Sequence, residues 1–532
     1  MNPDDGNIPD AAHHPKAFPT AIGFGAEASV RSPDAVVYKI NSLEDSAIPG
    51  DGKITYRECA LAREVTSPYY IPAARPRYCV FDVSGQIVLQ SSAWIIHPGI
   101  YIAGQSSPGG IEFRLGPQYS PVDSLIDTRL GGDHAIIRHI RTRLGEHPDR
   151  ISDNGDSLRT NSTSFQIFDH VSAMFATDES VNLAGCENCT IQWSIIGPNI
   201  CEDAGHSEGQ HCNSLFIKPS DYVTLAYNLS QHGERRGINI APGTFTPTGS
   251  TSSQADIIGN FLYNFVEEGG LLSNGSGSVY ANYISNSLYE GPRWSNRNGN
   301  YLAALYILED RVGFGFSIYG RDNISPWNSS GSDYRAPFGL YGQTTPWTVC
   351  GTNPTNRRDC TVTGLDVVQN DARVNAPGAP GNWLQDWMIV SGEQARRNVL
   401  TFAGADQCRD GSCRDNVDEM FIEDVQTCDR APRLFENAWT STVAATGGYA
   451  QLSSTGAAWP DSDNDGMPDI WEVQYNSTDP NVWDANADPD GDGYPNIEEY
   501  LNMLANDHAR YRDIYTAGDA ALPPYNCGRP SR

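Results

Sequence analysis

Short apolar segments typical of β-strands recur along this chain at intervals of about 25 to 30 residues. They include residues 79–89, 100–103, 135–140, 165–168, 190–195, 223–228, 257–263, 279–284 and 302–308. The loops between them vary in length and carry no helical pattern, and the Asn-Gly turns of a hairpin meander are few. This pattern favours a solenoid of parallel strands over a sandwich of hairpins.

A solenoid also fits the length and composition of the chain. Its 532 residues do not demand several domains, because an elongated repeat core grows by adding turns. With 39% hydrophobic residues, 51 glycines and 34 prolines, the chain can build a large core linked by many turns. We expect an all-β domain over residues 1–455, which begins with an extended segment at 17–30. Residues 320–400 carry no clear period, so we expect long loops and irregular strands over one flank there, whereas 396–427 look more helical or mixed.

Asparagines recur near the ends of several predicted strands. They could stack as ladders between neighbouring coils, or they could simply occupy tight turns. The positions are Asn228, Asn260, Asn264, Asn282 and Asn286.

The net charge of −29 and pI of about 4.6 indicate an acidic surface. Such a surface repels nucleic acid and anionic membranes, and it makes divalent cations natural partners. No apolar run reaches the roughly 20 residues that span a bilayer. We therefore expect neither nucleic-acid binding nor a membrane span.

Twelve cysteines, an even number, are typical of a protein from an oxidising compartment. Cys186 and Cys189 have the spacing of a redox motif or a zinc knuckle, but no second pair stands at ligand distance. The first five residues carry no basic and apolar leader, so we expect that a secretory leader has been removed. Local disulfides are plausible between Cys201 and Cys212, between Cys350 and Cys360, and between Cys408 and Cys413.

The composition changes at about Pro460, where two acidic loops follow one another. Each loop places oxygen ligands at positions one, three, five, nine and twelve and a glycine at position six, which is the pattern of an EF-hand-like calcium loop. A solvated acidic loop is the alternative. We predict two structural calcium ions in residues 456–505, a short helix at 497–504 and a tail at 506–532. The ligands would be Asp461, Asp463, Asp465, Asp469 and Glu472 in the first loop, and Asp488, Asp490, Asp492, Asn496 and Glu499 in the second.

Ordered motifs occur along the chain at 80–85, 102–105, 154–158, 168–183, 192–196, 260–264, 282–283 and 415–426. Together with the paired calcium loops, which often end bacterial members, they resemble the pectate lyases of the first polysaccharide lyase family. The resemblance implies a secreted, right-handed, single-stranded parallel β-helix that cleaves acidic polysaccharide by calcium-assisted β-elimination. In that reaction a calcium ion held by carboxylates binds the uronate, a basic residue removes the C5 proton, and the bond from C4 to the glycosidic oxygen breaks.

Three residues match the family's catalytic calcium site. Asp156 corresponds to its first carboxylate and Asp178 to its second, whereas Asn182 falls where many members have another acid. The 22 residues between Asp156 and Asp178 make about one coil, and adjacent coils lie about 4.8 Å apart, so the two could share one cation. Asn182 keeps an oxygen ligand but removes a charge. Asp178 could alternatively cap a strand end.

Arg236 best matches the family's proton-abstracting arginine, with Arg235 as the alternative. Gly237 follows where the family has proline, and a second family arginine is absent. Arginine is a poor base, because its pKa lies above about 12, so neighbours must aim it. A surface salt bridge is the other interpretation for either arginine.

The substrate-binding part departs further from the family, because Glu208 stands where relatives carry lysine. Lys218 could partly compensate for the missing cation. Three histidines are alternative bases or cations, although each could also be a packed or surface residue. They are His206, His211 and His232, whereas His170 is expected in the core or a turn.

The sequence thus predicts a secreted, monomeric, calcium-dependent lyase that acts on pectate or a related uronate polysaccharide. Two alternatives remain open. A β-helix that binds polysaccharide without cleaving it would agree with Glu208 and the missing arginine. A glycoside hydrolase on the same scaffold could use Asp156, Asp178 and Glu179 as its acids.

Overall fold

The computed structural model describes most of the chain outside the termini. The described residues are 15–48, 50–62, 75–116, 124–145, 155–200, 213–217, 220–233, 236–240, 252–265, 269–273, 277–289, 291, 305–308, 316–325, 338–341, 373–376, 379–428, 443, 448–452, 458–475 and 478–523. Within these residues, no helix is both long and apolar enough to cross a membrane.

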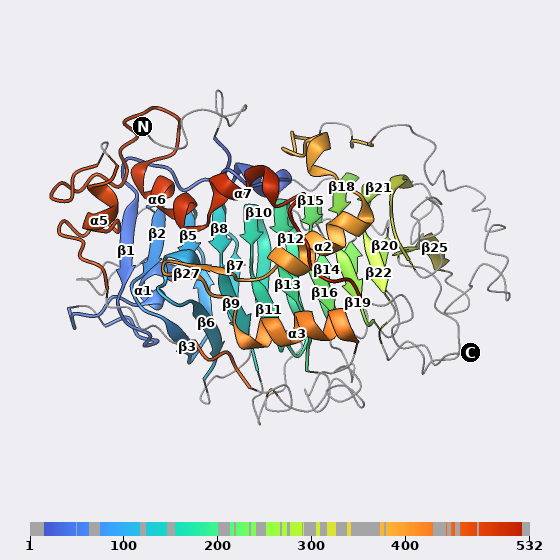
Figure 1. Ribbon diagram of the computed structural model, residues 1–532, viewed down its shortest axis with the longest axis horizontal. Coiled ribbons are helices and arrows are strands. Elements are labelled where there is room, and N and C mark those ends of the chain that lie inside the picture. Colours follow the sequence, from blue (N-terminus) through green and yellow to red (C-terminus); the bar gives the residue numbers. More distant parts are fainter. Residues whose placement is uncertain are drawn as a thin grey trace.

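Parallel strands stack side by side along the long axis of the molecule (Figure 1). They form three faces of a parallel β-helix, as predicted. The first face contains β4 (Ala93–Ile95), β7 (Ile126–Arg129), the first halves of β10 (Leu158–Asp169) and β12 (Glu179–Gln192), β14 (Asn213–Ile217), β17 (Ile238–Ile240), β20 (Gly270–Ser273), β23 (Leu305–Leu308) and β25 (Phe338–Tyr341).

The second face joins the first, because β10 and β12 continue round the corner into it. It contains β1 (Val36–Ile40), β2 (Arg77–Phe81), β5 (Ile100–Ala103), β8 (Ala135–Arg138), the second halves of β10 and β12, β15 (Ser220–Ala226), β18 (Ser252–Ile258), β21 (Ser278–Ile284) and β24 (Phe316–Arg321). The third face is a separate eight-stranded sheet. It contains β3 (Gly85–Leu89), β6 (Ile111–Leu115), β9 (Ile140–Arg143), β11 (Ser172–Met174), β13 (Ile195–Ile196), β16 (Leu229–Gln231), β19 (Phe261–Tyr263) and β22 (Ser287–Tyr289).

Several predicted strands are in fact pairs of strands. Residues 100–103 form one strand, β5, as predicted, but 79–89 divide into β2 and β3. Residues 257–263 likewise divide into β18 and β19. The single-strand predictions were wrong because a sharp corner between two faces interrupts the backbone ladder without interrupting the apolar pattern.

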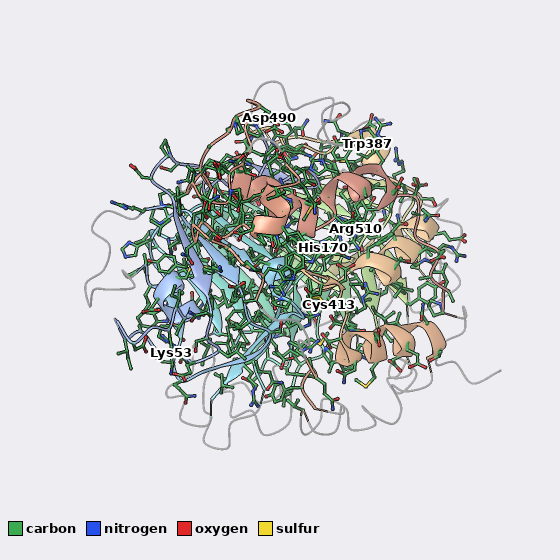
Figure 2. All side chains as sticks on the ribbon, turned by 60° about the vertical axis from the view of Figure 1, so that its left-hand side comes forward. Lys53, His170, Trp387, Cys413, Asp490 and Arg510 are labelled. Atoms are coloured by element: carbon green, nitrogen blue, oxygen red, sulfur yellow. A yellow bond between two sulfur atoms is a disulfide. The ribbon has the colours of Figure 1, made fainter. Side chains whose placement is uncertain are left out.

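Aromatic rings stack at the corner between the second and third faces. His139, His170, Trp193 and Tyr227 each adopt a left-handed backbone there, with φ between 49° and 58°. Ring centroids lie 4.7 Å apart for the two histidines and 4.4 Å apart for Trp193 and Tyr227. His170 lies in the interior below Arg510 (Figure 2), which confirms the predicted core or turn position. Stacking offsets part of the cost of the left-handed corners.

An asparagine ladder runs next to this corner. The Nδ2 group of Asn228 donates to Oδ1 of Asn260 at 3.0 Å, and that of Asn260 donates to Asn286 at 2.9 Å. Asn286 continues the ladder to Asn323, a position that the sequence pattern does not single out. The ladder interpretation is therefore right for these three positions. The other two differ, because Asn264 bonds to His232 and Asn282 bonds to Asp256.

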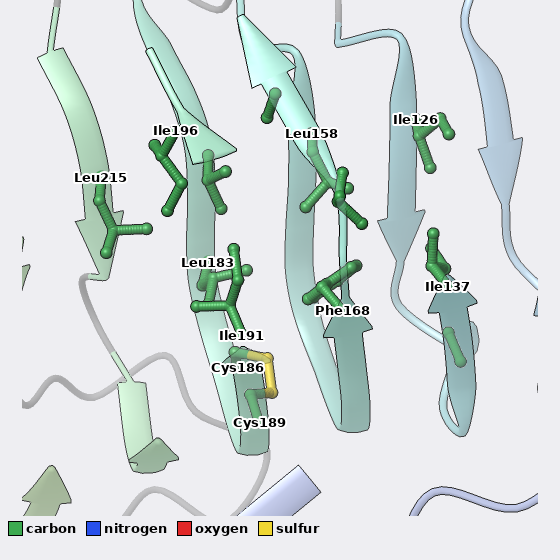
Figure 3. Packing of buried hydrophobic residues seen from close by; sticks show 14 of the residues in the cluster. Ile126, Ile137, Leu158, Phe168, Leu183, Cys186, Cys189, Ile191, Ile196 and Leu215 are labelled. Carbon is green, nitrogen blue, oxygen red and sulfur yellow. A yellow bond between two sulfur atoms is a disulfide. The ribbon is translucent and has the colours of Figure 1, made fainter. Parts of the chain in front are cut away.

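Apolar side chains fill the inside of the coils (Figure 3). Cys186 and Cys189 form a disulfide against this core, so they are neither a zinc knuckle nor an open dithiol. The predicted disulfide between Cys408 and Cys413 is present, and Cys59 pairs with Cys79. The predicted pairs Cys201–Cys212 and Cys350–Cys360 lie outside the described residues.

Helices cover the outside of the β-helix. The expected helical content of 396–427 is confirmed by α2 (Gly392–Phe402) and α3 (Asn416–Thr427), which contribute to an apolar cluster with strands of the third face. Shorter elements are η1 (Phe24–Glu27), α1 (Tyr56–Ala60), η2 (Gly104–Ser106), η5 (Asp386–Met388) and the small antiparallel pair β26 (Gln407–Cys408) and β27 (Gly411–Ser412). Most of the predicted loop region 320–400 lies outside the described residues.

The N-terminal segment crosses the second face. Its predicted extended form is interrupted by η1, where the Gly25 N–H donates to Oγ1 of Thr190 at 2.9 Å. A Cβ atom on Gly25 would stand 2.2 Å from the carbonyl oxygen of Gln166. This contact leaves no room for a side chain, so glycine is required.

The C-terminal helices lie along one edge of the β-helix, over its first coils (Figure 1). They are α5 (Asp469–Glu472), α6 (Asn496–Leu504) and α7 (Asp507–Asp513). Helix α6 confirms the helix predicted at 497–504, and its Ile497 and Leu501 join an apolar cluster with Tyr78 and Tyr101. This region therefore shares a hydrophobic core with the coils that it covers.

Candidate active site

Three buried carboxylates meet where two neighbouring coils enter the first face. Leu158 pairs with Val181, so Asp156 lies directly across from Glu179. Asp156, Asp178 and Glu179 each offer an oxygen within 4.8 Å of the others. Asp156 and Asp178 are thus brought together, and Glu179 joins them. From the sequence, Glu179 was expected only as a possible hydrolytic acid, although its place next to Asp178 at the start of a strand was a usable signal.

Hydrogen bonds fix the orientation of Asp156. It accepts from the N–H of Glu179 at 3.1 Å, from Nδ2 of Asn182 at 3.1 Å and from Oγ of Ser124 at 3.3 Å. Burial, followed by the charge of Glu179, raises the pKa of Asp156 to about 8. Buried like charges at this spacing are costly unless a cation or a proton intervenes.

The amide of Asn182 lies beside this cluster. Its Nδ2 is engaged with Asp156, whereas its buried Oδ1 has no hydrogen-bond partner among the described residues. Three carboxylates and one amide oxygen make a donor set that suits a hard cation such as Ca²⁺. The residues present therefore fit the predicted metal.

Arg236 reaches the acidic cluster from the next part of the first face. Its backbone oxygen accepts from Leu215, and the residue adopts a left-handed φ of 55° just before β17. Its guanidinium lies over the ring of Phe216, 4.9 Å from the centroid, and pairs with Oε1 of Glu179 at 2.5 Å. The side chain remains 23% exposed, so Arg236 links the buried acids to the surface.

Gly237 permits this close approach of the chain. A Cβ atom at this position would lie 2.2 Å from the carbonyl oxygen of Gly269 on the next coil. The departure from the family pattern at Gly237 thus has a local steric reason.

A row of mostly polar side chains continues in register on both sides of Asn182. Inward residues of these strands belong to the core, so strand alternation directs the intervening row away from the inside of the coils. Trp94, at one end, is 42% exposed and lies 4.0 Å from the Arg129 guanidinium. The row runs Trp94, Asp127, Arg159, Asn182, Phe216 and Asn239.

Of the other predicted groups, only His232 belongs to the residues that the structure describes. His232 is buried beside α3, where its Nε2 lies 3.1 Å from Asp424 and its Nδ1 lies 2.8 Å from Nδ2 of Asn264. Arg235, Glu208, Lys218, His206 and His211 lie outside the described residues. The choice between the two arginines therefore stays a prediction.

The two acidic loops bring their first three carboxylates together. Asp461, Asp463 and Asp465 form one cluster, and Asp488, Asp490 and Asp492 form the other. Asp490 lies at the periphery of the molecule (Figure 2). Position six is Gly466 in the first loop and Gly493 in the second, with φ values of 96° and 95° that suit glycine.

The later positions of the two loops differ from one another. In the first loop, burial and neighbouring carboxylates raise the pKa of Asp465 to about 7 and that of Glu472 to about 8. In the second loop, Asn496 donates to Asp484, and Glu499 lies half-buried on α6.

Proteins named as pectate lyases are similar in sequence to this chain. The chain is 27% identical over 504 residues to a protein named "Probable pectate lyase C" from Aspergillus terreus, covering 92% of this chain and 94% of the relative. The chain is related to pectate lyases along nearly its whole length. A protein of the same name from Emericella nidulans is 26% identical over 500 residues, covering 92% of each chain.

No model of a protein family matches the chain. A solved structure of a pectate lyase from Paenibacillus sp. 0602 aligns with a TM-score of 0.37 and 12% identity, covering 73% of this chain and 96% of that one. The β-helix assignment rests instead on the strand pairings of the protein itself.

Proposed function

We propose that this protein is a secreted, calcium-dependent polysaccharide lyase that cleaves pectate or a related uronate polysaccharide by β-elimination. The observation that carries the proposal is the buried cluster of Asp156, Asp178 and Glu179 with Arg236 against it. Relatives named as pectate lyases that align with 92% of the chain support the same reaction class.

The residues of the first face have separate parts in this reaction. Asp156, Asp178, Glu179 and the free amide oxygen of Asn182 would hold the cation. A bound calcium ion would engage the uronate carboxylate and stabilise the negative charge that grows there as C5 loses its proton. Arg236 is the proposed base. Its ion pair with Glu179 means that one carboxylate both completes the cation site and aims the guanidinium.

The spacing of the acids favours a metal site over hydrolysis by inversion. Inverting hydrolases separate their two carboxyl groups by about 6.5 to 9.5 Å, so that a water molecule fits between them. In this cluster the three acids come within 4.8 Å of one another. Elimination and hydrolysis also differ in their products, because hydrolysis adds water and elimination does not.

We further propose that the acidic loops bind calcium as structural sites and that the protein is exported. Disulfides between Cys59 and Cys79, between Cys186 and Cys189 and between Cys408 and Cys413 support an oxidising compartment.

A substrate panel tests the proposed reaction. The protein is incubated with polygalacturonate, glucuronan, alginate and ulvan, with and without a chelator, and ultraviolet-absorbing unsaturated ends are measured. We expect calcium-dependent product from at least one substrate. The absence of unsaturated ends from all four would favour a polysaccharide-binding protein without activity, and saturated ends would favour a hydrolase.

The same assay tests the cation site. Asp178→Asn should raise the calcium concentration needed for half-maximal activity by at least tenfold, because it removes one of three charges from the donor set. The exposed Asp34→Asn is the matched control and should behave like the wild type. Equal calcium requirements for both variants would remove Asp178 from the site.

A further inference from the structure

A carboxylate from outside the first acidic loop lies inside its ligand cluster. Asp484 belongs to the segment between the two loops, yet one of its oxygens lies within 4.8 Å of oxygens from Asp465 and Glu472. Asp465 also belongs to the cluster with Asp461 and Asp463. The first loop therefore gathers five carboxylates, one of which its twelve-residue pattern does not contain.

The buried carboxylate of Glu472 indicates that this cluster binds a cation. Its side chain is 1% exposed, and neither of its two carboxylate oxygens has a hydrogen-bond partner within the described part of the chain. The buried Oδ2 of Asp463 also lacks one. Burying carboxylate oxygens without partners is costly, so a cation between them is the natural partner.

The carboxylate at position nine of the first loop, Asp469, bonds to a neighbouring turn and not to the cluster. Asp469 accepts from the N–H of Ser462 at 2.7 Å through one oxygen and from its hydroxyl at 2.8 Å through the other. The carboxylate that the pattern assigns to the ion is thus occupied by a neighbouring turn. Asp484 lies within the cluster instead.

We propose that Asp484 is a direct ligand of the cation in the first loop, and that it couples the two loops to one another. The two loops, joined through Asp484, would then hold the first coils of the β-helix only when the cation is bound, and we call this arrangement the clamp. This inference rests on the proposed binding of calcium by the loops. It goes beyond that binding by assigning a ligand from outside either pattern.

The coupling follows from what else Asp484 contacts. Its backbone oxygen and Oδ1 accept from Nδ2 of Asn496, at 3.0 and 3.1 Å, where the second loop runs into α6. Two residues later, Glu498 pairs with Arg31 at 2.7 Å and accepts from the Tyr78 hydroxyl on β2 at 2.9 Å. An ion held by Asp484 therefore fixes the start of the helix that grips the β-helix.

The first loop also contacts the β-helix directly. Asp461 pairs with Lys39 of β1 at 2.9 Å, and a Cβ atom on Gly466 would lie 2.6 Å from Val37. Both ends of the clamp thus rest on the first coils. Loss of the first ion should loosen both contacts together.

Calorimetric titration of the whole chain with calcium, after removal of metal by a chelator, tests the proposal. Asp484→Asn should weaken one binding event at least tenfold and reduce the calcium-induced rise in unfolding temperature. Asp469→Asn should leave the affinity of every event within twofold. The exposed Asp513→Asn on α7 is the matched control for a lost acid.

Two outcomes would overturn the proposal in distinguishable ways. If Asp484→Asn binds like the wild type while Asp469→Asn loses an event, the loop pattern itself supplies the ligand and Asp484 does not. Asp463→Asn identifies the event that belongs to the first loop. If this variant removes no event from the titration, the first loop binds no calcium, and both the loop site and the clamp are wrong.

Discussion

Replacement of Asn260 by alanine should destabilise the β-helix strongly, although none of its hydrogen-bond partners is a proposed metal ligand or catalytic base. The side chain is 2% exposed and makes four hydrogen bonds. Its Oδ1 accepts from the N–H and Nδ2 of Asn228 at 3.1 and 3.0 Å. Its Nδ2 donates to the carbonyl of Leu225 and to Oδ1 of Asn286, both at 2.9 Å.

The expected loss follows from these bonds. Each contributes about 1 kcal/mol net, and truncation leaves buried partners from two neighbouring coils unsatisfied, so Asn260→Ala should lower the free energy of unfolding by about 4 kcal/mol. Urea unfolding followed by circular dichroism measures this change. The exposed Asn481→Ala is the control and should stay within about 0.5 kcal/mol of the wild type. A loss below about 1 kcal/mol for Asn260→Ala would show that the asparagine ladder contributes little to the free energy of unfolding.

Two further variants test the corner between the second and third faces and the contact of the N-terminal segment with the second face. Burial, followed by the neighbouring charges of His170 and Arg138, lowers the pKa of His139. The contribution of the neutral ring to the free energy of unfolding is therefore complete above pH 6.5, the ordinary pKa of histidine, and is lost as the pH falls below it. Between pH 7.5 and 5.5, the free energy of unfolding of the wild type should fall by about 1 kcal/mol more than that of His139→Phe, as measured by urea unfolding. An equal loss in both proteins would contradict this. Gly25→Ala should cost about 1 to 3 kcal/mol in thermal unfolding, and Gly381→Ala, which has open space around it, almost nothing. Similar values for both glycines would show that the tight contact is absent.

The architecture could be predicted from the sequence because its signal is periodic. Short apolar strands at regular intervals implied stacked coils, and the asparagine ladder was a recognised possibility at Asn228, Asn260 and Asn286. The division of residues 79–89 and 257–263 into two strands each could not be predicted. A corner of one or two residues changes the face of the coil while the apolar residues continue on both sides of it.

The family resemblance indicated Asp156, Asp178 and Arg236 from the sequence. For the two acids, a separation of about one coil also gave a physical reason why they could meet. The ion pair of Glu179 with Arg236 depends on the register of strands two coils apart, which spacing alone does not fix. Asp484 was missed for a related reason, because a local loop pattern cannot include a ligand that folds back from a later segment.

We propose that Arg236 and the acidic cluster carry out β-elimination on the first face. The most direct test compares the wild type with Arg236→Ala on polygalacturonate at saturating calcium, following unsaturated ends by ultraviolet absorbance. The wild type should release unsaturated product, and the variant should be at least about 100-fold slower with unchanged urea unfolding, because it lacks the general base. Full activity of Arg236→Ala would show that Arg236 is not the base, and saturated product from the wild type would show hydrolysis instead of elimination.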